Sequence, residues 1–311
     1  MFRKIGWVFA ALVSLAAITL LVLLQRANTE VLQLDDDARA KAPGQFVELT
    51  AGLTHYDIAG PETGPVVILV HGFSVPYYIW DTTFASLADA GFRVIRYDLF
   101  GRGYSDRPET NYNGELFEHQ IVDLIAELEL DSPVDVIGLS MGGAVSMRFA
   151  ADHPELVRKI VLVDPAHQAS QTPELPQLIG SILLALTYIP HAANGQMTDF
   201  VYPENYPSWV EQYRVQMTYE GFRRAIISTI YHFGPEDHLA NYRKVQSMGL
   251  PVKLIWGVED QTFDISGADT VRAVLDVDYM PVEDAGHLPH IEQAEITNSA
   301  IVEFLSDVFE P

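Results

Sequence analysis

A pentapeptide with a central serine is the part of the sequence best suited to covalent chemistry. Gly138, Ser140 and Gly142 occupy the G-x-S-x-G positions, after the apolar run 134–139 and before a segment rich in Gly, Ala and Met. A strand that turns sharply into a helix needs glycines around the serine, because Cβ atoms there would clash. The turn lifts the hydroxyl off the sheet, and the helix N-terminus favours negative charge beside it. The spacing therefore predicts Ser140 as a nucleophile.

A serine hydroxyl is a weak nucleophile and needs a general base within hydrogen-bond reach. Ten histidines are available, and His287 is the best placed of them. It follows Gly286 and stands between the expected last strand and last helix, so it can reach the carboxyl edge of the sheet. His290 is expected to point elsewhere, and most other histidines are expected in helices, in an inserted segment or at the surface. The sequence therefore predicts His287 as the base.

The base in turn needs a carboxylate that sets its tautomer and stabilises the imidazolium. Asp260 follows the apolar run 252–256 on a loop at the same edge of the sheet. Serine, aspartate and histidine then occur in the chain order expected for a nucleophile on such a turn. Asp164, at the end of the preceding strand, is a geometric alternative, and Asp264 and Glu259 are weaker ones.

The oxyanion formed during attack needs two backbone N–H donors. Met141, directly after the nucleophile, is expected to supply one. The second is expected from the loop after the apolar run 66–70, where Phe73 is the natural donor and Gly72 permits close approach. His71, in the same loop, is expected to hold the loop by hydrogen bonds and not to carry protons.

The elements that must position these residues follow an alternating pattern. Continuous apolar runs, typical of strands buried on both faces, are separated by helix-length segments. The expected strands are 46–50, 53–59, 66–70, 93–97, 134–139, 159–163, 252–256 and 277–282. The expected helices are 80–90, 115–129, 141–153, 267–275 and 292–308. This order predicts a doubly wound α/β fold: an eight-stranded, mostly parallel sheet with helices on both faces.

One interval breaks the alternation. Between Asp164 and Pro251 there is no convincing strand, but there is a helix-like apolar stretch, 178–189, followed by aromatic segments. A structureless loop of that length is uncommon in a compact domain. We therefore expect residues 165–245 to form a helical cap over a core built from residues 46–164 and 246–311.

The first 27 residues form an address segment and not part of the fold. Arg3 and Lys4 precede the uncharged segment 5–24, which as a helix covers about 30 Å, the thickness of a bilayer core. The segment ends in Gln25-Arg26-Ala27-Asn28, a poor cleavage site, which favours a membrane anchor over a cleaved signal peptide. Bases before the span predict a cytoplasmic N-terminus. The domain is then periplasmic or extracellular after a polar linker, residues 28–45; secretion after cleavage is the alternative.

Composition excludes several other classes of function. The chain has no cysteine, so disulfides, thiolate catalysis and cysteine-ligated metal sites are excluded. Its net charge is −23, or about −26 beyond the first 27 residues, which carry three bases and no acid. Such a surface repels nucleic acid and anionic head groups. We expect neutral or cationic small molecules as partners, with no nucleic acid and no cofactor.

The chain resembles the α/β-hydrolase fold family. The resemblance covers residues 46–308 and is carried, in order, by His71-Gly72-Phe73, Asp98-Leu99-Phe100-Gly101-Arg102-Gly103-Tyr104-Ser105, the segment 138–143, Trp256-Gly257-Val258-Glu259-Asp260 and Gly286-His287. It implies a triad of Ser140, Asp260 and His287, oxyanion donors at Phe73 and Met141, and a cap over the pocket. Carboxylesterases and membrane-anchored monoacylglycerol-lipase-like enzymes are the most similar branch. One departure is Gln261-Thr262-Phe263-Asp264, which lacks the proline that many members carry after the acid.

The function expected from these features is hydrolysis of acyl esters through an acyl-enzyme on Ser140. An apolar cap and a membrane anchor favour a neutral, apolar ester as substrate. Haloalkane dehalogenases and epoxide hydrolases use an aspartate nucleophile, so a serine at this position argues against both. Carbon–carbon bond hydrolases, proline iminopeptidases and cofactor-free haloperoxidases stay open as alternatives. A non-catalytic ligand-binding receptor is the alternative from another class.

Overall fold

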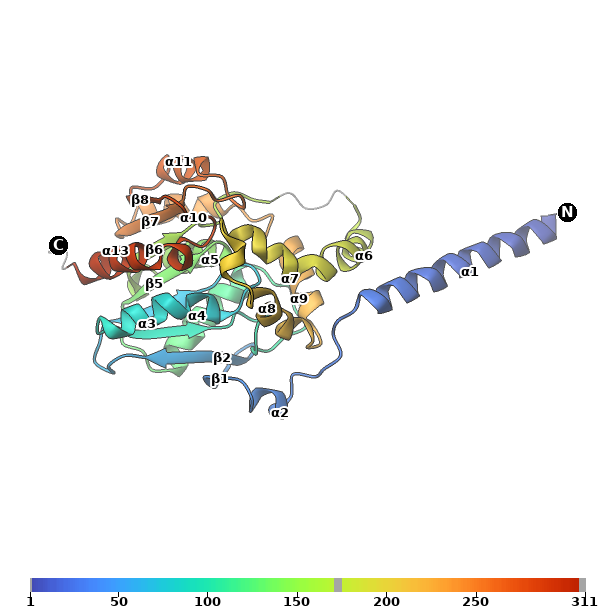
Figure 1. Cartoon of the computed structure of the whole chain (residues 1–311), viewed down its shortest axis with the longest axis horizontal. Helices are drawn as coiled ribbons and strands as arrows, with labels where there is room; N and C mark the ends of the chain where they lie inside the picture. Colours follow the sequence, from blue (N-terminus) through green and yellow to red (C-terminus); the bar gives the residue numbers. More distant parts are fainter. Residues whose placement is uncertain (1, 171–174, 308–311) are drawn as a thin grey trace.

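The computed structural model describes residues 2–170 and 175–307, in which eight strands form a single sheet (Figure 1). The order across the sheet is β1-β2-β4-β3-β5-β6-β7-β8. The strands are β1 (Gln45–Leu49), β2 (Gly52–Ala59), β3 (Val66–Val70), β4 (Arg93–Tyr97), β5 (Val134–Leu139), β6 (Val157–Val163), β7 (Val252–Gly257) and β8 (Asp278–Val282). Within this sheet β2 alone runs opposite to the other strands, so the predicted eight-stranded, mostly parallel sheet is confirmed.

The centre of the sheet is buried on both faces, as continuous apolar runs predict. All residues of β3 and β5 are buried. Because successive side chains of a strand point to opposite faces, Ile68 and Val70 join one core while Val67 and Leu69 join the other.

Helices cover both faces. One face carries α4 (Gly114–Glu127), α5 (Met141–Asp152), α10 (His238–Gln246) and α11 (Ser266–Arg272). The other carries α3 (Asp81–Asp89) and α13 (Ala294–Ser306), which pack against each other. The short helix α12 (Pro289–Glu292) precedes α13.

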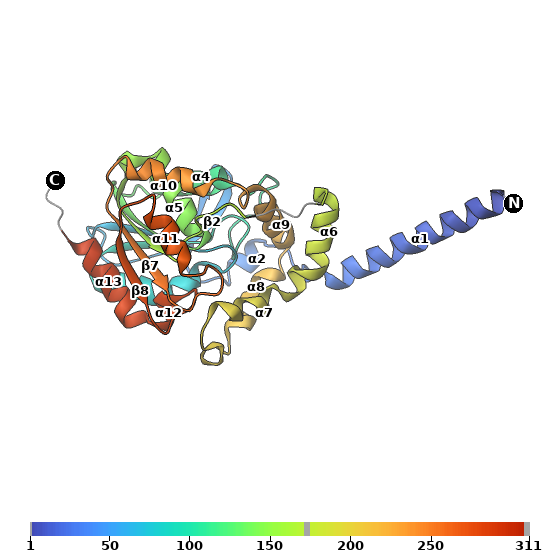
Figure 2. The same cartoon turned by 90° about the horizontal axis from the view of Figure 1, so that it is seen from above.

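The segment between β6 and β7 lies over the carboxyl edge of the sheet (Figure 2). It holds α6 (Gln177–Thr187), α7 (Ala192–Gly195), α8 (Trp209–Met217) and α9 (Phe222–His232), and no core strand among its described residues. The next helix, α10, packs on α5 in the core layer. Residues 238–245, which the sequence assigns to the cap, therefore belong to this layer by their packing.

The N-terminal segment projects from the domain as the helix α1 (Phe2–Ala27) (Figure 1). Two segments, Lys4–Ala27 and Gln177–Asp199, are long and apolar enough to be candidate membrane spans, a test that a signal sequence also passes. The linker contains the short helix α2 (Asp36–Arg39), and its start is bound to the cap: the N–H groups of Val31 and Leu32 donate to the Thr218 carbonyl at 2.8 and 2.9 Å.

Element ends differ from the sequence prediction mainly by one or two residues. The largest difference in an end is that of the expected helix 267–275, which as α11 ends at Arg272. The expected helix 292–308 begins at Ala294 as α13, because Gln293, with φ −122° and ψ 48°, is not helical and separates it from α12. Its last residue, Val308, lies outside the described residues.

Candidate active site

Ser140 stands at the turn between β5 and α5 in a backbone conformation that side-chain-bearing residues rarely adopt. Its φ is 54° and its ψ is −121°. Its N–H donates to Val163 O at 2.9 Å, and its carbonyl accepts from Gly143 N and Ala166 N, each at 2.9 Å. Such strain persists only where the surroundings hold it, and it is typical of functional sites.

The glycines beside Ser140 are required by close backbone packing. A Cβ on Gly142 would meet the carbonyl oxygens of Val70 and His71, the latter at 2.5 Å, and a Cβ on Gly143 would lie 2.6 Å from the Pro165 ring. The end of β3, the turn and the segment after β6 therefore approach one another more closely than side chains permit.

His287 and Asp260 meet at the carboxyl edge of the sheet. His287 Nδ1 lies 2.8 Å from Asp260 Oδ2, and both residues are buried. The other carboxylate oxygen, Asp260 Oδ1, accepts the N–H groups of Thr262 and Phe263 at 2.7 and 3.0 Å. The loop after β7 thus fixes the carboxylate through backbone donors, and a proline after the acid is not needed for this geometry.

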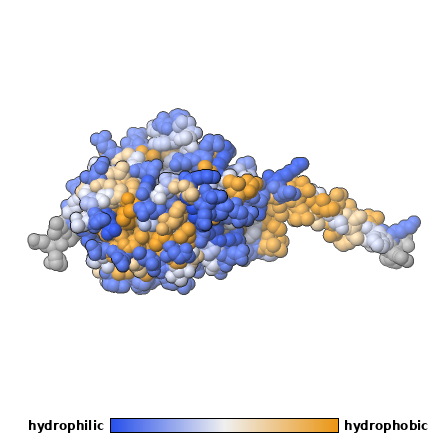
Figure 3. Space-filling model, turned by 90° about the horizontal axis from the view of Figure 1, so that it is seen from below, coloured by the Kyte–Doolittle hydropathy of each residue, from blue (hydrophilic) through white to orange (hydrophobic). Residues whose placement is uncertain are grey.

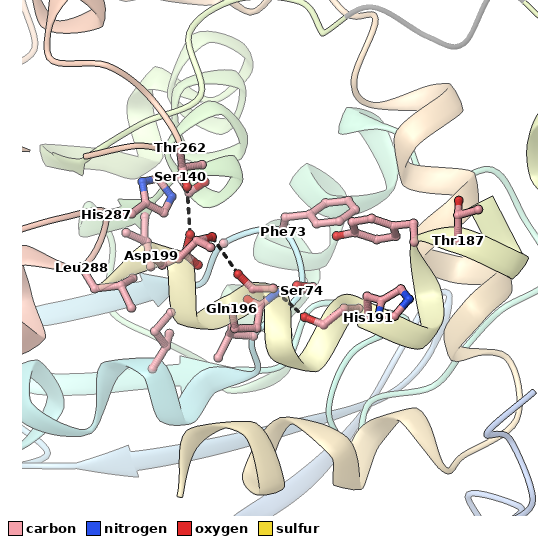
Figure 4. Close-up of a pocket in the computed structure, with 18 residues that line it drawn as sticks. Phe73, Ser74, Ser140, Thr187, His191, Gln196, Asp199, Thr262, His287 and Leu288 are labelled. Atoms are coloured by element: carbon pink, nitrogen blue, oxygen red, sulfur yellow. Dashed lines mark hydrogen bonds between the residues drawn. The ribbon is translucent and has the colours of Figure 1, made fainter. Parts of the chain in front are cut away.

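The imidazole of His287 is held so that its second nitrogen is free to take a proton. Because Nδ1 donates to Asp260, Nε2 is left as the acceptor. Burial disfavours the imidazolium, but the charge and hydrogen bond of Asp260 and the charge of Asp199 outweigh it, so the pKa of His287 is raised above 6.5. Figure 4 shows the His287 ring beside Ser140.

Asp164, the alternative acid, lies close to the pair without replacing Asp260. One oxygen of Asp164, one oxygen of Asp260 and one nitrogen of His287 all lie within 4.8 Å of one another. Asp164 Oδ1 accepts from Gly257 N at 2.9 Å. Burial, and then the neighbouring Asp260 charge, raise the pKa of Asp164 well above its usual range. The group has the composition of a metal site, but Nδ1 of His287 already donates to Asp260 and is no ligand in this arrangement.

The two weaker acid candidates point to other partners. Asp264 Oδ1 accepts from Ser266 N at 2.9 Å, and Glu259 Oε2 accepts from Ala285 N at 3.1 Å. His290 donates from Nε2 to Ile79 O at 3.0 Å, and burial lowers the pKa of His290 to about 3. None of these three residues faces Ser140 as a partner.

The expected oxyanion donors border Ser140. Phe73 and Ser140 line the same cavity, while Met141 is the first residue of α5. The first N–H groups of a helix have no partner within it. Among the described residues, the N–H groups of Phe73 and Met141 donate to no protein acceptor. Both are therefore available to a substrate oxygen.

The loop that carries Phe73 is held by hydrogen bonds from the core and from the cap. His71 donates from Nδ1 to Gly72 O at 2.8 Å and accepts from Leu99 N at 2.9 Å, and burial lowers the pKa of His71 to about 4. His71 is thus neutral and structural, as the sequence predicts. Arg102 donates from Nε to Phe73 O at 2.8 Å, and Gln216 of α8 donates to Ser74 O at 2.8 Å.

Ser140 lies between two cavities. The larger, of about 410 Å³, has an apolar floor and a polar rim from the cap (Figure 4). Its floor is formed by Val75, Ile79, Leu139 and Leu288, and its rim includes Thr187, Gln196, Thr198 and Asp199. The smaller, of about 270 Å³, is lined by apolar side chains such as Met141, Ile230, Phe233 and Phe263 and by polar ones such as Gln168, Ser170, Thr229 and His238. Two cavities that share Phe73 and Ser140 can hold the two sides of one scissile bond.

Three residues of the site escape sequence reasoning. Arg102 belongs to a recognised motif, but its role depends on its reach to Phe73. Asp199 and Gln216 come from the cap. Asp199 accepts from the Thr262 hydroxyl at 2.8 Å, and its carbonyl accepts the His287 N–H at 2.8 Å. In the sequence, Asp199 and Gln216 are polar positions in an otherwise apolar cap, and this is the pattern that could indicate a role in the site.

Comparisons with known proteins agree with this fold. The family described as alpha/beta hydrolase fold matches residues 65–294, and the chain belongs to it. An AB hydrolase superfamily protein of Bacillus subtilis is 28% identical over 85% of this chain and 98% of its own length. A human monoacylglycerol lipase is 24% identical over 80% of this chain and 77% of its own length. The solved enol-lactonase of Burkholderia xenovorans has a TM-score of 0.73 at 23% identity, covering 85% of this chain and 100% of that structure.

The matches also include proteins named as epoxide hydrolases and as meta-cleavage product hydrolases. Family membership therefore identifies a hydrolase, while the bond it cleaves must be argued from the site itself.

Proposed function

We propose that this chain is a membrane-anchored serine hydrolase that cleaves neutral carboxylic esters through an acyl-enzyme on Ser140. His287 takes the serine proton as the hydroxyl attacks the carbonyl, and Asp260 orients and stabilises the imidazolium. The N–H groups of Phe73 and Met141 bind the oxyanion. His287 then returns its proton to the leaving alcohol, and water repeats the sequence to release the acid.

The observation that carries this proposal is the buried Asp260–His287 pair at 2.8 Å, beside a strained serine. The neighbouring N–H groups of Phe73 and Met141 have no acceptor within the described part of the chain. A fold kept only for ligand binding has no need for a serine at φ 54°. The strain and the unsatisfied donors favour catalysis over a receptor role.

Serine as the nucleophile also favours esters over epoxides. Attack of a serine oxygen on an epoxide carbon gives an ether, which water does not readily cleave, whereas attack on a carbonyl gives an ester that it does. Relatives named as epoxide hydrolases therefore support the fold, and the human monoacylglycerol lipase supports the chemistry proposed here.

The cavities favour a substrate with a sizeable group on each side of the carbonyl. The larger combines an apolar floor with a half-buried carboxylate, Asp199, and the hydroxyl of Thr198. This lining suits an apolar acyl ester that also carries a hydroxyl group, such as a monoacylglycerol. Free fatty acids and acidic peptides are disfavoured by the negative charge.

We also propose that α1 is retained as the anchor and that the domain faces away from the cytoplasm. Arg3 and Lys4 before the span and the poor cleavage site after it support this arrangement. Mass spectrometry of the mature N-terminus tests it: the proposal requires a chain that keeps residues 5–24, and a chain that starts after Leu24 contradicts it.

The test of the chemistry combines labelling and turnover. A fluorophosphonate probe is expected to label the full-length protein and not the Ser140→Ala variant. Turnover is then measured on monoacylglycerols and p-nitrophenyl esters of increasing acyl length, with a proline amide and a vinylogous diketone alongside. Ester turnover that survives Ser140→Ala, or a preference for the amide or the diketone, contradicts the proposal.

A further inference from the structure

The cap helix α6 presents a large apolar face that no other part of the described chain covers. The side chains of Leu178, Ile179 and Leu183 are 74, 52 and 48% exposed, and Leu175, just before the helix, is 44% exposed. The three- and four-residue spacings among these positions place them along one side of the helix. The sequence of α6 contains no charged residue. An exposed apolar face of this size marks a contact surface.

This face lies where α1 joins the domain. The helix α6 contacts α1 (Figures 1 and 2), and Leu24 of α1 lines one groove together with Leu178 and Ile182. Figure 3 shows hydrophobic colour running from α1 onto the adjoining end of the domain.

The segment after α1 is tied to the cap, so α1 cannot move far from α6. Glu220 N donates to Leu32 O at 2.9 Å, and the Thr29 hydroxyl donates to Met217 O at 2.8 Å. Together with the bonds of Val31 and Leu32 to Thr218, these contacts fix the exit of α1 against the turn between α8 and α9.

We propose that α6 lies in the lipid–water interface of the bilayer that α1 spans, with Leu178, Ile179 and Leu183 among the acyl chains. The inference rests on the anchoring role proposed for α1. The helix α6 itself has 11 residues and is about 16 Å long, too short to cross a core of about 30 Å. The rest of the candidate span Gln177–Asp199 packs into the domain, where Ile189, Ala192 and Ala193 are buried, so α6 lies along the membrane surface and does not cross it. The acidity of the domain favours a zwitterionic bilayer over an anionic one.

This placement brings the mouth of the catalytic cavity to the membrane. The helix α6 ends at Thr187, and Thr187, Tyr188 and His191 line the cavity of Ser140. Figure 4 shows Thr187 and His191 at the end of the cavity remote from His287. A lipid ester can then pass from the bilayer along α6 to the serine without crossing bulk water.

The absence of cysteine makes a direct test possible, because a single introduced thiol can carry an environment-sensitive fluorophore. Three full-length variants are reconstituted in phosphatidylcholine vesicles: Leu178→Cys on α6, Val13→Cys in α1, and Asp269→Cys on α11, whose side chain is 79% exposed. Labels on Leu178→Cys and Val13→Cys are expected to be quenched by lipids with spin-labelled acyl chains. The label on Asp269→Cys is expected to be quenched only by aqueous iodide.

The outcomes separate this inference from the anchor. If the Val13→Cys label escapes lipid quenching, the anchor itself is wrong. If the Val13→Cys label is quenched while the Leu178→Cys label behaves like that on Asp269→Cys, the anchor stands and the placement of α6 is overturned. A Leu178→Cys label shielded from both quenchers, with energy transfer between copies, means that a second copy covers α6, which also overturns the inference.

A kinetic arm uses two isoleucines of matched exposure. Ile179 on α6 is 52% exposed and Ile296 on α13, at the far side of the domain, is 51% exposed. Ile179→Glu is expected to lower hydrolysis of a vesicle-embedded lipid ester roughly tenfold, because the charge opposes burial in the interface. Hydrolysis of soluble p-nitrophenyl butyrate is expected to stay unchanged, and Ile296→Glu is expected to affect neither. Equal effects of Ile179→Glu on both substrates, or none on either, contradict the inference.

Discussion

The carboxyl groups of Asp164 and Asp260, which follow the neighbouring strands β6 and β7, share one buried site, with an oxygen of each within 4.8 Å of the other and of a His287 nitrogen. Asp260 makes the hydrogen bond to His287, while burial, and then the neighbouring carboxylate, raise the pKa of Asp164 well above the usual range. Two carboxylates that close do not both ionise readily. Asp164, whose pKa is raised, is therefore the carboxyl that stays protonated.

The different roles of the two carboxyl groups predict different effects of two isosteric substitutions. Asp260→Asn is expected to lower kcat by about 10⁴-fold, because His287 loses its charged partner and its correct tautomer. Asp164→Asn replaces a neutral carboxyl by a neutral amide that can still accept from Gly257 N, so kcat is expected to stay within about threefold. Steady-state kinetics on p-nitrophenyl butyrate compare the two, and a larger loss in Asp164→Asn makes Asp164 the acid.

The raised pKa of Asp164 also predicts that Asp164→Asn stabilises the fold, and more so at higher pH. A carboxyl whose pKa is raised on folding contributes stability below its unfolded pKa, and this contribution is lost as the pH rises through the folded value. Asparagine does not titrate, so Asp164→Asn is expected to raise the Tm relative to the natural chain more at pH 8 than at pH 5. Thermal unfolding in detergent at both values measures this, and a difference that shrinks with pH contradicts the protonated state.

The activity of the natural chain is expected to fall on the acidic side with a midpoint above pH 6.5. Protonated His287 cannot accept the serine proton, and its pKa is raised because the partners Asp260 and Asp199 outweigh burial. Asp199→Asn keeps an acceptor for Thr262 and removes one of these charges. The kcat/KM profile of this variant is expected to shift to lower pH while its maximum changes little. An unchanged midpoint excludes Asp199 as a source of the shift.

The pattern of apolar runs in the sequence is enough to predict the parts of the active site that lie at strand ends. Ser140 and Asp260 follow the buried strands β5 and β7, and His287 follows the edge strand β8. Because the carboxyl ends of parallel strands meet at one edge of the sheet, the sequence alone indicates that the three residues lie near one another. The contacts of Asp199 and Gln216 depend on how the cap folds back over that edge. No periodicity carries this information, because the cap packs through aromatic contacts such as that between Phe200 and Trp209, with ring centroids 5.1 Å apart.

The sequence also does not indicate that α10 packs in the core layer and not in the cap. The helix has polar and charged residues along most of its length, so its sequence does not indicate core packing. Two of its buried side chains, Tyr242 and Val245, join the core cluster nevertheless, Leu239 packs against it, and Tyr242 donates to Ala166 O at 2.9 Å. A few apolar contacts therefore suffice to pack a largely polar helix against the core.

Arg102 is expected to act as a positioning residue for the oxyanion loop. Its buried guanidinium donates to Phe73 O, Phe100 O and the Thr229 hydroxyl at 2.8, 3.1 and 2.9 Å. A lysine keeps the charge but not this planar fork. Arg102→Lys is expected to lower kcat by roughly tenfold or more, with little change in KM, because loss of a full oxyanion donor costs 10²–10³-fold.

Arg107 provides the matched control for Arg102→Lys. It is half-buried, and desolvation lowers the pKa of both guanidiniums to about 10, but Arg107 donates to Gly103 O and not to Phe73. Arg107→Lys is expected to keep the natural kcat and the natural rate of fluorophosphonate labelling. A rise in KM without a fall in kcat in Arg102→Lys contradicts a positioning role. Equal losses of kcat in Arg102→Lys and Arg107→Lys contradict it too.

A buried ion pair, His55 with Asp98, is expected to set the pH range of greatest stability. His55 Nδ1 lies 2.7 Å from Asp98 Oδ2, and Asp98 also accepts the N–H groups of Tyr77 and Tyr104 at 2.8 and 2.9 Å. Burial opposes both charges, but each partner outweighs it, so the pKa of His55 is raised and the pKa of Asp98 is lowered.

The directions of the pKa shifts of His55 and Asp98 define the pH range in which the pair stabilises the fold. The contribution of His55 is complete below its unfolded pKa of 6.5 and is lost as the pH rises through the folded value. The contribution of Asp98 is complete above 3.8 and is lost as the pH falls through its lowered folded value. Asp98→Asn is therefore expected to destabilise the chain most near pH 5, by about 3–5 kcal/mol as for other broken buried pairs, and less at pH 9. Urea unfolding of the Ser140→Ala background at both pH values measures this, and a loss that is equal at both contradicts an ionic pair. The control is fluorophosphonate labelling of Asp98→Asn with Ser140 intact. A destabilised variant that still labels at Ser140 shows that the pair acts in folding and not in catalysis.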